Sequence, residues 1–79
     1  MNVHTAQTLA TRLRDRRLAC GMTQAQLAAQ SRVSVGELAA IEQGLTDTPY
    51  FTSVALIARV LGVDAHWLYY GTDDGSPQS

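Results

Sequence analysis

The segment TQAQLAAQSRVSVGELAAIEQG, residues 23–44, constrains the fold of this 79-residue chain more than any other. Each half begins with the pattern of a capping box. In TQAQ the Thr23 hydroxyl can cap one free backbone amide while Gln26 reaches back to another, and SVGE repeats the pattern from Ser34. Gly44 is a typical residue just past a helix end. The segment therefore predicts two short helices joined by the tight turn SRVS.

Three other segments also have helical patterns, and no segment is a convincing strand. Leu9 and Leu13 recur at i, i+4 in the first, and Gly62 stops the second. Asp64 is placed to cap the third, which Gly71 ends. These segments are residues 5–20, about 52–61, and 64–70. We predict an all-α fold, a compact five-helix bundle that contains a helix-turn-helix.

The chain is predicted to form one domain over residues 5–71, with the helix-turn-helix motif at residues 23–43. Residues 1–4 are expected to be flexible, and the polar tail TDDGSPQS, residues 72–79, to be disordered. Such a tail could end a small complete protein, or it could begin the linker of a longer two-domain one.

Charge is distributed unevenly along the chain, whose net charge is −1. Four of its six basic residues cluster in RLRDRR, and beyond Ser34 only Arg59 is basic. A nucleic-acid binder is usually more basic than this. Arg12 and Arg14 could contact a nucleic-acid backbone, but we favour a solvated helix face balanced by Asp15.

Several functional classes find no support in the sequence. Cys20 is the single cysteine, and His4 and His66 have no ligand-spaced partners, so no disulfide, metal or cofactor is expected. No nucleophile–base pair, acid pair or phosphate loop can be assembled, so we expect neither an enzyme nor a small-molecule substrate. No apolar stretch approaches the roughly 20 residues that span a bilayer. We therefore expect no membrane association and a cytoplasmic protein.

Two short helices joined by a tight turn within a helical bundle are typical of DNA-binding proteins. The stretches LRDRRLACGMTQAQLAAQS, IEQG and LGVDAHWLYYGT resemble the helix-turn-helix family of lambdoid-phage Cro proteins and repressor amino-terminal domains. The resemblance covers about residues 9–72. It implies a non-enzymatic protein that binds a pseudo-palindromic double-stranded DNA operator as a homodimer, with the second motif helix in the major groove.

The resemblance also implies roles for individual residues. Gln24 and Gln43 match phosphate contacts, and Arg17 and Glu42 match a salt bridge between helices. The family dimerises through its C-terminal region, which gives four candidate interface residues: Phe51, Trp67, Leu68 and Tyr70.

The residues expected to face bases depart from the family pattern. Relatives often carry amide or basic side chains where this chain has Val35, Gly36 and Ala40. Val35 offers only apolar contact, for instance to a thymine methyl group, and the other two permit close approach. Glu37 could accept a hydrogen bond from cytosine, or it could simply complete the Ser34 capping box.

The turn and the loop after the motif depart as well. Arg32 stands where the family prefers glycine, which predicts a left-handed backbone with modest strain, and its side chain could reach phosphate or lie in solvent. The loop has Leu45, Asp47 and Tyr50 in place of basic residues, which should weaken phosphate binding. The full set of expected DNA-binding residues is Thr23, Gln24, Arg32, Ser34, Val35, Gly36, Glu37, Ala40 and Gln43.

Two functional hypotheses follow. The leading one is a sequence-specific transcriptional regulator, Cro-like or repressor-like, of phage or prophage type. The alternative is a helix-turn-helix scaffold that acts as a protein-interaction module, like an antirepressor, with weak or no DNA binding. The apolar DNA face and the acidic loop favour the alternative, and the motif itself favours the regulator.

Overall fold

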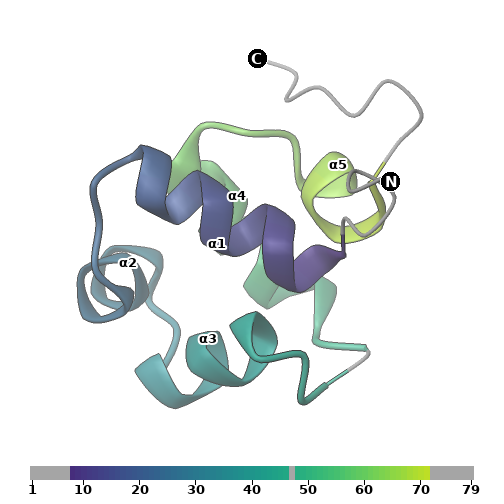
Figure 1. The fold of residues 1–79 in the computed structure, drawn as a ribbon, viewed down its shortest axis with the longest axis horizontal. Helices are drawn as coiled ribbons and strands as arrows, with labels where there is room; N and C mark the ends of the chain where they lie inside the picture. The colour runs from purple at the N-terminus through teal and green to yellow at the C-terminus, as the bar shows by residue number, and fades with distance from the viewer. Residues whose placement is uncertain (1–7, 47, 72–79) are drawn as a thin grey trace, which may run out of the picture.

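A computed structural model describes residues 8–46 and 48–71, which form five helices and, within those residues, no strand. Figure 1 shows α1 running across the middle of the molecule, with α5 beside its start and α2 beyond its end. The predicted all-helical fold is confirmed. The helices are α1 (Leu9–Ala19), α2 (Gln24–Ser31), α3 (Val35–Glu42), α4 (Phe51–Leu61) and α5 (Ala65–Tyr70).

Side-chain caps fix where most of the helices begin. Thr8 caps α1 in a reciprocal box with Thr11, so the helix starts later than the predicted Thr5. Asp64 caps α5 by accepting a 2.9 Å hydrogen bond from the Trp67 amide, as predicted. No side chain caps α4, which begins directly after Tyr50.

The core forms where all five helices meet. α2 packs against α3 and α4, α1 packs against α3 and α5, and α4 packs against α5. Ala28 on α2 is buried in this core. The buried apolar residues are Leu13, Leu27, Ala28, Leu38, Ile41, Val54, Ile57, Ala58, Leu61, Val63, Trp67 and Leu68.

Trp67 and Leu68 belong to this core, which corrects their prediction as dimer-interface residues. Trp67 is only 5% exposed and Leu68 is fully buried. Burying an aromatic and an aliphatic side chain inside one protomer already removes their apolar area from water. Neither residue presents its side chain to a partner on the surface of the folded chain.

Arg12 is also buried, which corrects the prediction that it lies on a solvated helix face. The residue is 6% exposed. Its Nε donates to the Leu68 carbonyl at 3.0 Å, and its Nη2 donates to the Tyr69 carbonyl at 2.9 Å. The last carbonyls of a helix lack intrahelical partners, so Arg12 caps the C-terminus of α5 from another helix.

The predictions for residues 1–4 and 72–79 lie outside the described residues. None of the helices in the described part of the chain is long and apolar enough to cross a membrane.

Candidate nucleic-acid interface

The start of α2 is shaped by a complete capping box. The Thr23 hydroxyl accepts from the Gln26 amide at 3.0 Å, and the Gln26 side chain accepts from the Thr23 amide at 2.9 Å. Thr23 is exposed and Gln24, the first residue of the helix, is half-buried. Free amides at a helix N-terminus attract anions, so this end of α2 is suited to a phosphate group.

A charged network ties α1, α2 and α3 together behind this point. Arg17 donates hydrogen bonds to both carboxylate oxygens of Glu42, from Nε to Oε2 at 2.7 Å and from Nη2 to Oε1 at 2.9 Å. Gln24 donates to the same Oε1 at 3.0 Å, and Arg17 also donates to the Met22 carbonyl at 2.9 Å. The ion pair implied by the resemblance is present, and it reaches the predicted phosphate-binding side chain, Gln24.

The environment of Glu42 favours its charged form. Burial opposes ionisation, but hydrogen bonds from Arg17 and Gln24 outweigh it, and the pKa of Glu42 lies below its ordinary value. The hydrogen bond to Glu42 raises the pKa of Arg17. Both groups are therefore charged at neutral pH, and the network holds the three helices in one arrangement.

The turn between α2 and α3 contains the predicted left-handed residue. Arg32 ends α2 at φ 64° and ψ 34°, and among the described non-glycine residues it alone has a positive φ. Left-handed backbone costs a residue with a Cβ free energy that glycine avoids. The Val33 amide then bonds the Ala28 carbonyl at 3.1 Å, which closes the turn.

α3 presents its first residues to solvent. The Ser34 hydroxyl accepts from the Glu37 amide at 3.0 Å, but the return bond expected of a capping box is not formed by the Glu37 carboxylate. Val35 is 49% exposed and Gly36 is exposed, whereas Glu37 and Ala40 are half-buried. A Cβ added at Gly36 would meet no atom within 4 Å, so the space above this backbone is open.

The loop after α3 adds exposed apolar side chains to the same region. The apolar side chain of Leu45 is exposed, and Tyr50 is 78% exposed. Gln43, directly after α3, is also exposed, but it is polar. A shallow hollow between the loop and α3 is lined by Glu37, Ala40, Ile41, Thr46, Thr48, Pro49 and Tyr50. Asp47 lies outside the described residues. The described part of this loop carries no basic side chain.

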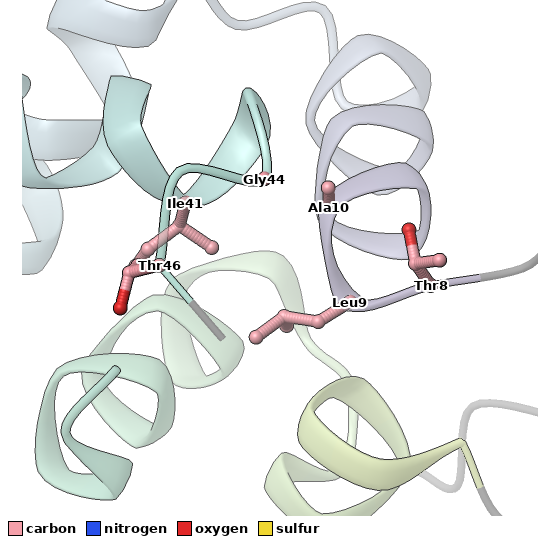
Figure 2. A pocket seen from close by; sticks show the side chains of 6 residues that line it. All are labelled: Thr8, Leu9, Ala10, Ile41, Gly44 and Thr46. Carbon is pink, nitrogen blue, oxygen red and sulfur yellow. The ribbon is translucent and has the colours of Figure 1, made fainter. Parts of the chain in front are cut away.

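A second hollow separates α3 from the start of α1. Figure 2 shows Ile41, Gly44 and Thr46 on one side and Thr8, Leu9 and Ala10 on the other. None of these lining residues is charged, so the hollow offers no group that would ionise or hold a metal. Among residues 8–46 and 48–71, no cluster of His, Cys, Asp and Glu could hold a metal ion.

The predicted dimer residues Phe51 and Tyr70 do lie together on the surface. Their rings stack with centroids 6.5 Å apart, and both contact His66, at 5.3 and 5.8 Å. Tyr69, which sequence reasoning missed, completes the group at 5.7 Å from Phe51 and 4.7 Å from Tyr70. We call these four residues the aromatic surface. The adjacent tyrosines of AHWLYY were the available signal.

The structure thus joins the first residue of α2, Gln24, to the last residue of α3, Glu42, while the aromatic surface lies on α4 and α5. A model of the helix-turn-helix domain family matches residues 8–67. The match spans the motif, the buried charged network and α4, and it supports a DNA-binding regulator in general. The chain belongs to the helix-turn-helix domain family.

Proposed function

We propose that the chain is a sequence-specific transcriptional regulator, similar in type to Cro and repressor proteins of phages or prophages, with no enzymatic activity. It binds a pseudo-palindromic operator as a homodimer. The observation that carries this proposal is the exposed, unobstructed start of α3, fixed relative to α2 by the Arg17–Glu42–Gln24 network. A rigid helix start of this kind can enter a major groove.

Base recognition in this proposal depends on close approach. Val35 is exposed and can contact a thymine methyl group. Gly36 and Ala40 have no side chain larger than a methyl group, so they do not hold the α3 backbone away from the bases. A helix without long side chains can approach the base edges closely only where groove width allows it. The protein would therefore read DNA shape together with thymine methyl groups.

Neutral polar groups supply the backbone contacts. Thr23 and Gln24 lie at the start of α2, Ser34 lies at the start of α3, and Gln43 is exposed at the end of α3. Arg32 is the one basic side chain in the turn. Few counterions are released when neutral groups bind phosphate, so affinity should fall only gently as salt rises.

The aromatic surface is the proposed homodimer contact. Phe51 and Tyr70 are exposed, and aromatic residues are enriched at protein interfaces. The Tyr69 hydroxyl donates to the Pro49 carbonyl at 2.6 Å, which fixes this ring and leaves the others to meet a partner. Trp67 and Leu68 contribute from beneath by holding α5 in place.

Selection of bound duplexes from a random DNA pool at low salt tests the proposal directly. A dyad-symmetric site bound at least about a thousandfold more tightly than bulk DNA would support it. If no sequence is enriched, the proposal of specific DNA recognition is wrong.

Gly36→Ala then tests the mode of recognition. The added methyl group meets no atom in the free protein. Alanine is more favourable than glycine within a helix by about 1 kcal/mol, so the variant should be at least as stable as the wild type. If DNA approaches this backbone closely, specific affinity should fall about tenfold or more while affinity for bulk DNA changes little. Unchanged specific affinity would show that Gly36 is not a point of close approach.

A second candidate function rests on the exposed apolar residues beside α3. Leu45 and Tyr50 would suit a protein surface as well as DNA, and the described loop has no cation to hold phosphate. The alternative is an antirepressor-like module that binds a related repressor. Failure of the DNA selection, together with a heterodimer that depends on Leu45 and Tyr50, would favour it.

A further inference from the structure

A hollow of about 280 Å³ lies between the end of α2 and the later turns of α4. It contains no residue of α3, so it is distinct from the proposed base-reading surface. None of its lining residues is acidic. They are Gln30, Ser31, Arg32, Leu56, Arg59 and Val60.

The fold brings two basic side chains to this hollow. Four of the six basic residues lie on α1, and the other two, Arg32 and Arg59, both line it. Within the described structure, neither forms an ion pair with a carboxylate. Two arginines far apart in a chain of net charge −1 therefore line one hollow to which no acidic side chain contributes.

Ser31 supplies an independent indication of a ligand. The residue is 1% exposed, and its Oγ makes no hydrogen bond with any other described residue. A buried hydroxyl without a partner is unfavourable, and native proteins rarely leave one. Ser31 lines the hollow with its Oγ covered, so an oxygen atom of a ligand could accept a hydrogen bond from this hydroxyl once neighbouring side chains shift.

Apolar side chains flank the two arginines. Leu56 and Val60 are four residues apart on α4, with Arg59 beside them, and both line the hollow. Leu56 is exposed and Val60 half-buried. The site thus combines cationic forks suited to oxyanions with an aliphatic surface.

We propose that this hollow docks an acidic segment of a protein partner, with a carboxylate held by Arg32, Arg59 and Ser31 and an apolar side chain packed on Leu56 and Val60. A peptide carries both kinds of group side by side, whereas a nucleic-acid backbone offers only phosphates and sugars. No residue of α3 lines the hollow, but Arg32 is also a proposed phosphate contact, so the partner and DNA would compete for that side chain, whereas Arg59 would serve the partner alone.

An NMR titration of the full chain tests the proposal with the peptide acetyl-Leu-Asp-Glu-Leu-amide. The amides of Ser31, Arg32 and Arg59 should shift, and the neutral peptide acetyl-Leu-Asn-Gln-Leu-amide should bind much more weakly. Arg59→Gln should weaken binding of the acidic peptide about tenfold, the effect expected when one charge-assisted contact is lost. Arg14→Gln removes the same charge from an exposed site on α1 and should change binding little.

Ser31→Ala gives a second, independent variant. Removing an unpartnered hydroxyl should leave the fold at least as stable, yet it should weaken peptide binding. Operator binding by Arg59→Gln should be unchanged, so failure of this proposal is distinguishable from failure of DNA recognition.

Three results would overturn the proposal. The shifted amides could map elsewhere, or Arg59→Gln and Arg14→Gln could weaken binding equally, which would indicate only general attraction between charges. Inorganic phosphate could bind at the same amides as tightly as the acidic peptide, which would make the hollow a site for free oxyanions and not for a protein segment.

Discussion

Two arginines of α1, little more than one helical turn apart, hold opposite ends of the molecule by different chemistry. Arg17 grips the Glu42 carboxylate and so holds α3 and Gln24 at the proposed DNA-binding end. Arg12 donates to two backbone carbonyls at the end of α5, beneath the aromatic surface. One helix therefore organises both proposed contact regions.

The difference between the two arginines lies in their partners. Burial lowers the pKa of Arg12, whereas the hydrogen bond to Glu42 raises that of Arg17. Glu42 is itself titratable and loses its charge in acid, whereas the carbonyl oxygens of Leu68 and Tyr69 keep their partial charge at every pH. The two ends of the molecule should accordingly respond differently to substitution and to acid.

Glu42→Ala should have the largest effect on stability. It leaves Arg17 buried without its carboxylate partner, and removal of one member of a buried pair typically costs about 3–5 kcal/mol. Urea unfolding followed by circular dichroism measures the loss. The double variant Arg17→Met, Glu42→Leu should be less destabilised than Glu42→Ala, because no unpaired charge remains. Equal losses in both would indicate that packing, and not charge, dominates at this site.

Arg12→Ala should cost less, about 2–3 kcal/mol, because it leaves two carbonyl acceptors of α5 without their side-chain donor. Hydrogen exchange should accelerate in α5 before it does in α2 and α3. Arg14→Ala, at an exposed position on the same helix, is the matched control and should change stability by no more than about 0.5 kcal/mol. A uniform increase of exchange in all helices would argue against a local capping role.

Gly71→Ala tests the same cap from the other side. Its backbone has φ 68°, and an added Cβ would lie 2.6 Å from Nη1 of Arg12. Gly62→Ala is the control, since φ is 73° there and a Cβ would meet nothing within 4 Å. Gly62→Ala should lose about 1–2 kcal/mol from left-handed backbone alone. If Arg12 is held in place, Gly71→Ala should lose about 1 kcal/mol more stability than Gly62→Ala. If the Arg12 guanidinium can move aside, the two variants should lose the same amount.

The sequence predicts the bonding partner of Arg17 but not the partners of Arg12. The Arg17–Glu42 pair joins two ionisable side chains in motifs that resemble a known family, so both partners leave a trace in the sequence. Arg12 bonds backbone carbonyls, which any residues at positions 68 and 69 would supply. No pattern marks such a partner, so the sequence alone favours a solvated face for Arg12.

Helix positions were predictable where a side chain caps a helix or a glycine ends it. Asp64, Gly62 and Gly71 act as their residue types predict. The inward and outward faces of α5 were not predictable, because AHWLYY is apolar or aromatic at nearly every position and a six-residue helix has no clear period. Only packing against the other helices decides that Trp67 is buried and Tyr70 exposed.

The smallest of the predicted effects is the loss of folding stability in acid, which should differ between the site of Arg17 and the site of Arg12. The pKa of Glu42 is depressed in the folded protein, so its contribution to stability is present above the ordinary glutamate pKa of about 4.3 and is lost as pH falls through the lower folded value. Glu42→Gln mimics the protonated side chain. The stability difference between wild type and Glu42→Gln, measured by urea unfolding, should therefore shrink as pH falls from 7 to 3. The carbonyl oxygens of Leu68 and Tyr69 do not titrate, so the part of the difference between wild type and Arg12→Ala that they contribute should stay constant. If the Arg12→Ala difference also shrank in acid, a carboxylate would contribute to the site of Arg12, and the contrast between a titratable and a non-titratable partner would fail.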